Sequence, residues 1–246
     1  MKKVKNYIFF GIYLLLNPRL FKLALHRLYI PVYVQYEWLK DYDIKTVIDV
    51  GAYRGQVSQV LNYLFPKAMI YAFEPIEESA KIILKSYPSE KIIVENLALS
   101  NRTGVAIFYK NYYLPSSSLL PLKQPYKKRY RLKKKIKVKT TTLDSYFKGQ
   151  ALKKHVFLKI DVQGNEGLVL EGGKNFIKKV SVIHIETASK RQYKGQQLFA
   201  EIYNYLTDLG FEYSGAISDS EFYPSFKPLG RFNAIFINSS TIKKVS

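Results

Sequence analysis

The chain has 246 residues and contains no cysteine, three histidines and one tryptophan. Without cysteine there are no disulfide bonds, thiolate zinc sites or cysteine nucleophiles, and three histidines leave little material for a histidine-based metal site. We therefore expect no bound metal. Acidic residues are also scarce, since 19 of them stand against 39 lysines and arginines and leave a formal charge of +20. Such a charge predicts an anionic partner or environment.

A chain of this length, in which 47% of the residues are hydrophobic, can bury one sizeable core, which predicts one α/β domain with appendages. We expect an N-terminal apolar and amphipathic helical segment over residues 1–40 and a ligand-binding α/β domain over residues 41–238. Within that domain, residues 103–142 form a basic insertion, and residues 239–246 form a polar, frayed tail.

The first 30 residues combine a short apolar run with a basic amphipathic segment. The run from Tyr7 to Leu16 has ten residues, whereas a membrane span needs about twenty. It resembles the core of a signal peptide, but no small-x-small cleavage site follows it. Residues 18–30 have the spacing of an amphipathic helix. Residues 1–30 therefore either anchor a cytoplasmic protein peripherally at the inner face of the membrane or cover one face of its domain.

Residues 46–74 have the pattern of a strand, a glycine-rich loop, a helix and a second strand. The first strand ends in the loop GAYRG (51–55), the helix stops before Pro66, and the second strand ends at Glu74. Glycines in the first turn and an acid 23 positions after Gly51 (74 minus 51) are typical of a mononucleotide-binding βαβ unit.

Two carboxylates bear on which nucleotide is bound. Glu74 can accept hydrogen bonds from both ribose hydroxyls of either NAD or S-adenosylmethionine. Asp49, two residues before Gly51, would repel a pyrophosphate at the helix N-terminus but attract a sulfonium and an ammonium group. Tyr53 stands where a dinucleotide fold needs a small residue. These residues favour S-adenosylmethionine as the cofactor, with an ordinary turn or N-cap residue as the alternative for Asp49.

Beyond the second strand, the sequence predicts a helix over about 76–86 and a third strand over 91–95, followed by Asn96. The loop after the third strand of a doubly wound sheet lies beside the base of the nucleotide. We expect Asn96 to hydrogen-bond the adenine while Leu97 or Ala98 packs on its face. The alternative is that Asn96 is an ordinary turn residue.

Residues 103–142 interrupt the alternation of strands and helices, which predicts an inserted hairpin or lid. The segment 123–139 has ten cations and no acid, and its second half alternates apolar and polar residues as a half-exposed strand does. Candidate residues for binding an anionic substrate are Lys128, Arg129 and Arg131. Contact with a membrane surface and a merely solvated face are the alternatives. No RNA-binding motif accompanies the cations, so we do not expect nucleic acid as a partner.

The second half of the chain supplies candidate catalytic residues. A strand over 156–160 contains Lys159, which must meet a carboxylate if it is buried. Asp161 follows at the carboxyl end of this strand, where ligands bind in such sheets. A further strand over 180–185 ends at Glu186, which lies beside Asp161 if the two strands are neighbours. The last two strands are expected to form an antiparallel hairpin at the edge of the sheet.

From Thr46 to Phe236 the chain resembles the FkbM-type S-adenosylmethionine-dependent methyltransferases. The resemblance rests on the motifs VIDVGAYRG, AFEP, NLALS followed by Gly104, TTLDSYF, LKIDVQGNE and HIE, in this order. It implies an α/β class I methyltransferase fold, a Rossmann-like doubly wound sheet of strand order 3-2-1-4-5-7-6 with an antiparallel seventh strand. It also implies O-methylation of a sugar, a glycan or a related metabolite.

The resemblance also implies roles for individual residues. By position, the cofactor contacts of the family fall on Asp49, Gly51, Glu74 and Asn96. We add their neighbours Ala52, Tyr53, Gly55 and Pro75 as further candidate cofactor contacts. The edge of the active site falls on Lys159, Asp161 and Glu166, and the candidate substrate-binding residues are Gln163 and Glu166.

Two residues depart from the family pattern. Tyr53 stands where the family usually has an asparagine, so the contact of that asparagine to the methionine end of the cofactor is not carried over. Gln163 stands where the family usually has a glutamate, so no metal or general-base role is carried over to that position.

These residues predict a division of roles in methyl transfer to a hydroxyl group. The reaction needs alignment, exclusion of water and a proton acceptor. Asp161 is the first candidate for the base and Glu186 the second, while Lys159 holds Asp161 in place. Two other functions stay open, an NAD-dependent sugar oxidoreductase and a non-catalytic glycan- or lipid-binding module. The basic insertion favours an anionic glycan or a lipid-linked sugar as the acceptor.

Overall fold

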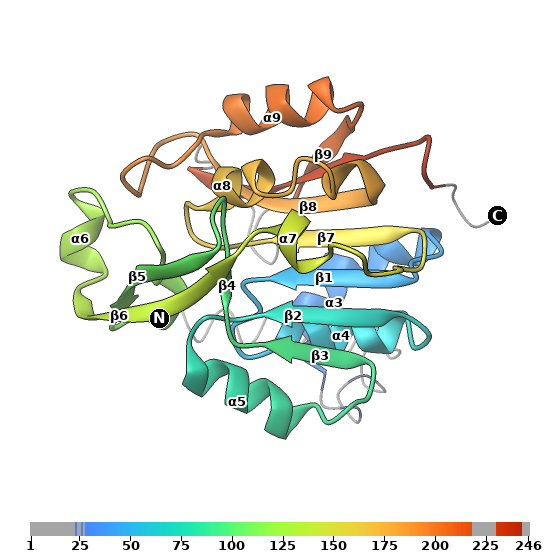
Figure 1. Ribbon diagram of the computed structural model, residues 1–246, viewed down its shortest axis with the longest axis horizontal. Coiled ribbons are helices and arrows are strands. Elements are labelled where there is room, and N and C mark those ends of the chain that lie inside the picture. The colour runs from blue at the N-terminus through green and yellow to red at the C-terminus, as the bar shows by residue number, and fades with distance from the viewer. Residues whose placement is uncertain (1–22, 24–25, 27, 218–229, 243–246) are drawn as a thin grey trace, which may run out of the picture.

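The computed structural model describes residues 23, 26, 28–217 and 230–242. Seven strands form one sheet of order β3-β2-β1-β7-β8-β10-β9, with helices on both faces (Figure 1). The strands are β1 (Thr46–Val50), β2 (Met69–Phe73), β3 (Ile92–Glu95), β7 (Val156–Ile160), β8 (Val180–Ala188), β9 (Glu212–Ile217) and β10 (Arg231–Ile237). Strand β10 is antiparallel to β8 and β9, and the other pairs are parallel. Counted within this sheet, the order is 3-2-1-4-5-7-6, which confirms the class I methyltransferase fold.

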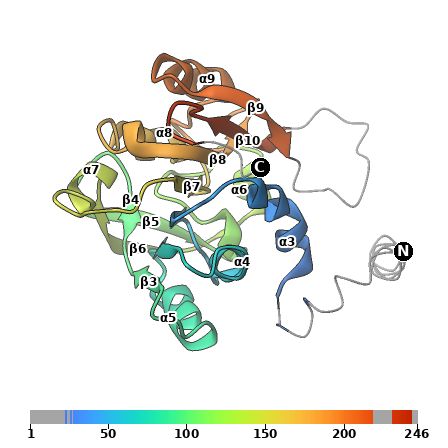
Figure 2. The same cartoon turned by 90° about the vertical axis from the view of Figure 1, so that its right-hand side faces the viewer.

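The sheet is buried on both faces by two hydrophobic clusters. Side chains alternate along each strand, so Val47 of β1 joins the first cluster and Ile48 joins the second. The first cluster packs against α3 (Ile30–Tyr36), the 3-10 helix η1 (Glu37–Asp41), α4 (Gln56–Leu64) and α5 (Glu77–Ser86). The second packs against α7 (Leu143–Tyr146), α8 (Glu166–Glu171), η3 (Ile177–Lys179) and α9 (Phe199–Asp208). Figure 2 looks along the strands and shows α3 and α7 on opposite sides of the sheet.

Both ends of the described chain contribute to the first cluster. Leu23 and Leu28 are buried there, so these two residues of the amphipathic segment cover a face of the domain. Residues 1–22 lie outside the described residues, and membrane anchoring through them stays a prediction. No described helix is long and apolar enough to cross a membrane. Ile242 is buried in the same cluster, so the polar tail is packed at this apolar residue rather than frayed from 239 onward.

The basic insertion, together with the short strand that precedes it, forms a second, three-stranded sheet of order β4-β6-β5. Its elements are β4 (Ala98–Leu99), β5 (Gly104–Asn111), the 3-10 helix η2 (Leu114–Ser116), α6 (Tyr126–Arg129) and β6 (Leu132–Thr141). Strands β5 and β6 are antiparallel, which confirms the predicted hairpin. Figure 1 shows this hairpin beyond the carboxyl ends of β1, β2 and β3. It packs on a small hydrophobic cluster of its own, formed by Ile76, Ala98, Phe108 and Val138.

The strand order determines which polar residues meet. Strand β1 lies between β2 and β7, and in this register Asp49 is the partner of Lys159. Strands β7 and β8 are parallel neighbours, as the placement of Asp161 beside Glu186 required. The carboxyl ends of β1, β2, β7 and β8 therefore converge at one edge of the sheet.

Candidate active site

A cleft of about 250 Å³ lies at this edge, between the loops after the strands and the insertion. Seven of the residues predicted for the site line it: Gly51, Tyr53, Glu74, Pro75, Asp161, Gln163 and Glu186. Nine of the predicted residues lie elsewhere: Asp49, Ala52, Gly55, Asn96, Lys159, Glu166, Lys128, Arg129 and Arg131.

The loop after β1 needs glycine where it approaches the loop after β7. Gly51 has φ +82°, and a Cβ on it would lie 1.9 Å from the carbonyl oxygen of Asp161. No side chain fits there, so the two strand ends touch through the backbone. Gly55 is also left-handed, but a Cβ on it would meet Tyr87, a helix-packing contact away from the cleft. The backbone N–H of Ala52 donates to Phe73 and fastens the loop to β2.

Glu74 at the end of β2 is held by two backbone donors. The N–H of Tyr53 lies 2.8 Å from Oε2, and the N–H of Ile76 lies 2.8 Å from Oε1. Burial raises the pKa of Glu74 to about 7, although both N–H groups and Lys159 act in the opposite direction. Tyr53 therefore contributes its backbone to the site, and its side chain lines the cleft.

Asn96 does not face this cleft. Its Nδ2 donates to the carbonyl oxygen of Glu74 at 2.9 Å, and its side chain borders a second cavity between α5 and β6. The prediction that Asn96 contacts the adenine therefore has no support in this geometry, because its amide is used to hold the end of β2. Leu97 and Ala98 do line the cleft, where an aromatic base would pack.

Asp49 and Lys159 form a pair inside the sheet. Both are buried, with Nζ of Lys159 3.1 Å from Oδ1 of Asp49, while Ser58 donates to Oδ2 at 2.7 Å. Nζ also donates to the carbonyl oxygen of Gly51 at 2.8 Å. Burial by itself lowers the pKa of Lys159, but the charges of Asp49 and Asp161 outweigh it and raise that pKa above its usual value.

This pair confirms that Lys159 meets a carboxylate, and it changes the interpretation of Asp49. The negative charge of Asp49 is compensated by Lys159 and does not face the cleft. The argument that Asp49 selects a sulfonium over a pyrophosphate by its charge is therefore not supported by the geometry. Its observed contacts instead hold α4 and the loop after β1, through Ser58 and through Lys159 respectively.

The side of the cleft formed by Asp161 and Glu186 contains a polar network centred on Gln163. Nε2 of Gln163 donates to Oδ1 of Asp161 at 2.7 Å and to Oε2 of Glu186 at 2.8 Å. Its Oε1 accepts from Nη1 of Arg231 at 3.0 Å and lies 3.3 Å from the hydroxyl of Tyr193. Arg231 also pairs with Glu186, Nε to Oε1, at 3.1 Å. The departure from the family pattern at Gln163 thus gives this chain an amide that bridges two carboxylates.

Glu166 supports a loop instead of lining the cleft. Its Oε1 accepts from the N–H groups of Val162 and Gly164, at 3.1 and 2.9 Å. Burial raises the pKa of Glu166 above its usual value. Glu166, Asp161 and Glu186 each have a carboxylate oxygen within 4.8 Å of the others. Each of the three carboxylates accepts at least one hydrogen bond from the chain, from Gln163 or from the N–H groups of the loop.

Sequence reasoning missed the part of the insertion that reaches the cleft. The cations Lys128, Arg129 and Arg131 lie outside it, and the guanidinium groups of Arg129 and Arg131 sit over Tyr130 and Tyr112. The cleft is lined instead by the segment before them, Tyr113, Leu114, Pro115, Ser117 and Leu119. The sequence feature that could have indicated this segment is an apolar stretch with a proline, inside an otherwise polar loop.

Tyr193, which sequence reasoning also missed, connects this segment to Gln163. Its hydroxyl lies 3.0 Å from the carbonyl oxygen of Ser116, and its ring packs against Gly164, where a Cβ would clash. Backbone bonds from Lys123 to Gln192 and from Lys194 to Pro121, at 2.8 and 2.9 Å, fasten the same two segments. The insertion is thereby fixed over the cleft.

Comparison with known proteins agrees with this fold. Residues 49–213 match the methyltransferase FkbM domain. The 2-O-methyltransferase NoeI of Sinorhizobium fredii is 27% identical over 160 residues, which cover 61% of this chain and 66% of that protein. The aligned region thus spans just under two thirds of the length of this relative.

Solved methyltransferase structures are more distant. Precorrin-6y C5,15-methyltransferase of Geobacter metallireducens has a TM-score of 0.45 at 15% identity, over 84% of this chain and 86% of that chain. Magnesium protoporphyrin IX methyltransferase of Synechocystis, solved with bound S-adenosylmethionine, has a TM-score of 0.47 at 12% identity, over 85% and 76%. These distant likenesses bear on neither site nor substrate. The matched domain, however, covers well over half of the chain, and this chain therefore belongs to the FkbM family of S-adenosylmethionine-dependent methyltransferases.

Proposed function

We propose that this chain transfers a methyl group from S-adenosylmethionine to a hydroxyl group of a sugar, a glycan or a related metabolite. The observation that carries the proposal is that Glu74 and Asp161 line one cleft, together with Gly51 of the loop after β1. The family and the relative named as a 2-O-methyltransferase support the same reaction class.

The donor side of the cleft fits the adenosyl part of the cofactor. Glu74 offers carboxylate oxygens to ribose hydroxyls, Leu97 and Ala98 offer apolar surface to the base, and Gly51 permits close backbone approach. When bound, the cofactor supplies an electrophilic methyl group on a sulfonium. Because Glu74 is ionised only above its raised pKa, its ability to balance the positive charge depends on pH.

Of the two candidate bases, Asp161 is better suited than Glu186. Glu186 is buried, and its two oxygens are engaged by Arg231 and Gln163. Asp161 lines the cleft with a side chain that is 37% exposed, with Oδ1 engaged by Gln163 and Oδ2 3.9 Å from Lys159. Oδ2 of Asp161 is therefore the atom that we assign to take the proton that the acceptor hydroxyl loses.

The insertion excludes water from the reaction. Phe108, Leu114 and Leu119 line the cleft with apolar surface, and Tyr193 holds this segment against the loop of Gln163. Removing water strengthens the electrostatic contacts of Asp161 and keeps the acceptor oxygen aligned.

The proposal is tested by mass spectrometry of host extract fractions incubated with the protein and with S-adenosylmethionine that carries an isotope-labelled methyl group. A labelled methyl ether on a hydroxyl compound supports it. Labelling of carbon or nitrogen, or no labelling by a protein that binds the donor in calorimetry, contradicts O-methylation. Titration with NADH in the same calorimeter distinguishes the oxidoreductase alternative, since only an NAD enzyme binds it tightly.

A further inference from the structure

The outer face of the β5–β6 hairpin alternates bulky and cationic side chains. Three cross-strand pairs occupy this face: Val105 with Lys139, Ile107 with Lys137, and Tyr109 with Lys135. Directly opposed residues in an antiparallel pair lie on the same side of the sheet, so all six side chains form one surface. We call it the hairpin face.

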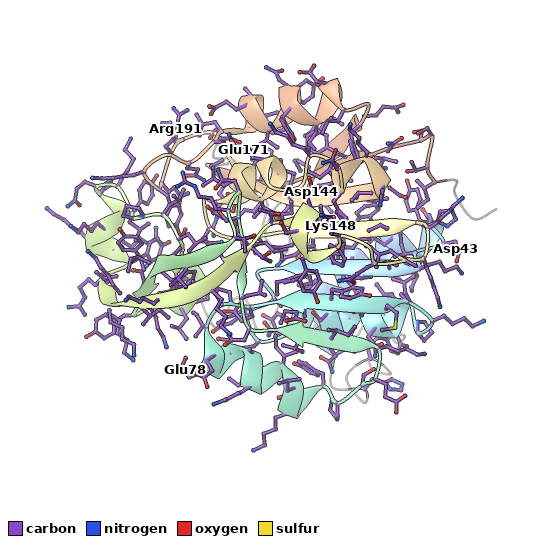
Figure 3. All side chains as sticks on the ribbon, viewed as in Figure 1. Asp43, Glu78, Asp144, Lys148, Glu171 and Arg191 are labelled. Carbon is purple, nitrogen blue, oxygen red and sulfur yellow. The ribbon has the colours of Figure 1, made fainter. Side chains whose placement is uncertain are left out.

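On the inner face of the same hairpin, a lysine is paired with a carboxylate. Lys110 is buried and donates to Oε1 of Glu78 at 2.9 Å. Glu78 is labelled in Figure 3, on the helix α5. On the hairpin face, by contrast, Lys135, Lys137 and Lys139 are exposed and form no ion pair with any described residue. Neither β5 nor β6 contains an acid. These three lysines therefore have no direct ion-pair partner among the described residues, although Lys137 and Lys139 also border the second cavity, which Glu77, Glu78 and Glu95 line as well.

The same face also exposes apolar surface. Val105 is 68% and Ile107 44% exposed, although both are aliphatic residues in regular strands. Beyond the end of β5, Tyr112 and Tyr113 are exposed as well, and Tyr113 also lines the cleft. The ring of Tyr109 carries the ammonium group of Lys135 over it, at 5.6 Å. Two exposed aliphatic side chains and a tyrosine on β5 therefore stand directly opposite three exposed lysines on β6, which joins apolar and cationic surface on one face.

We propose that the hairpin face docks on an anionic lipid bilayer. Lysines attract the anionic headgroups, exposed valine and isoleucine enter the interface, and tyrosines occupy the headgroup level. A second copy of the chain is a poor partner because it carries the same +20 charge. Single-stranded nucleic acid would stack on aromatic rings and make no use of Val105 or Ile107. An anionic glycan would also leave these two side chains in water.

The hairpin face is part of the same insertion that lines the cleft. The hairpin extends beyond the carboxyl ends of the sheet strands (Figure 1), and the segment that follows β5 lines the cleft. This inference does not depend on which carboxylate is the base or on the methyl acceptor.

The test is sedimentation of the full chain with vesicles of phosphatidylcholine, alone or in an equimolar mixture with phosphatidylglycerol. We expect binding to the mixed vesicles, weakened by salt because the attraction is electrostatic. The combined variant Lys135→Glu, Lys137→Glu and Lys139→Glu should bind at least about tenfold more weakly. A control variant with the same charge change, Lys148→Glu, Lys154→Glu and Lys178→Glu, should lose no more than about twofold, since these lysines lie off the face. Figure 3 shows Lys148 next to α7.

A second variant tests the apolar part without altering charge. Val105→Ser with Ile107→Ser should weaken binding about threefold or more, and the loss should persist in high salt. Both side chains are largely exposed, so neither change disturbs the core. Equal binding by wild type and the triple-glutamate hairpin variant would overturn the proposal. An equal loss of vesicle binding in the control variant would also overturn it, as would equal binding of the wild type to vesicles of phosphatidylcholine alone. A third contrary result would be that single-stranded RNA displaces the wild type from the vesicles while the serine variant binds the vesicles normally.

Discussion

Lys159 and Asp49 form an ion pair 3.1 Å apart inside the central sheet, and both side chains are buried. Removing one partner leaves an uncompensated charge in an apolar environment. We expect Lys159→Met to lower the free energy of unfolding by about 3 to 5 kcal/mol. Urea denaturation followed by circular dichroism measures this loss.

The double variant Asp49→Asn with Lys159→Met provides the control. It removes both charges, so its loss should be clearly smaller than the sum of the two single losses. If the losses of unfolding free energy in the two single variants simply add up in the double variant, the interaction between Asp49 and Lys159 contributes nothing to stability.

Asp161→Asn should abolish turnover and leave donor binding unchanged, because Asp161 is assigned to the proton and Glu74 to the ribose. An asparagine keeps the volume but is a far weaker base. Glu186→Gln should reduce turnover less, since this carboxylate is occupied by Arg231 and Gln163. Calorimetry gives the affinity and a methyl-transfer assay the rate. The reverse order of the two losses would identify Glu186 as the base.

Donor affinity should rise with pH through about 7, the raised pKa of Glu74. Below this value the carboxyl is protonated and neutral, and above it the carboxylate accepts the ribose hydroxyls and balances the sulfonium. The ionised fraction grows about tenfold between about pH 6 and about pH 8, so the dissociation constant should fall by up to that factor. Glu74→Gln should bind weakly and lose this pH dependence. A wild-type affinity that is flat over this range rules out the assigned role.

The raised pKa of Glu166 predicts in which direction the stability of the fold changes with pH. Its pKa is raised by burial, so the folded state holds a proton that the unfolded state releases, and stability falls as pH rises above the unfolded pKa. Glu166→Gln keeps an acceptor oxygen for Val162 and Gly164 and should reduce this fall. Glu166→Ala leaves two buried donors without a partner and should cost about 2 kcal/mol. Thermal unfolding at several pH values separates the two variants.

The local parts of the site were predictable from the sequence. The βαβ unit, the glycine at 51 and the acid at 74 follow from strand and turn patterns within some thirty residues. Asp161 and Glu186 followed from their positions at strand ends, once the strands were taken as neighbours. Lys159 was correctly expected to need a carboxylate, because a buried lysine is costly alone.

The remaining assignments depended on contacts that no local pattern contains. Asp49 meets Lys159 across more than a hundred positions of the chain, so its compensation is visible only in the register of β1 and β7. Asn96 and Glu166 use their side chains to hold nearby backbone, and the same residue types at the same strand ends would equally suit ligand contacts. The reach of Tyr113 and Tyr193 into the site depends on how the insertion folds back.

The separate cluster beneath the insertion has a consequence for how such enzymes diversify. Ile76, Ala98, Phe108 and Val138 pack apart from the two clusters of the main sheet. A segment that packs on a separate hydrophobic cluster can be lengthened, shortened or exchanged while the two clusters of the main sheet stay unchanged. Among related chains that modify different molecules, we expect the greatest divergence between positions 104 and 141, while the turn at Gly51 and the acid at Glu74 persist.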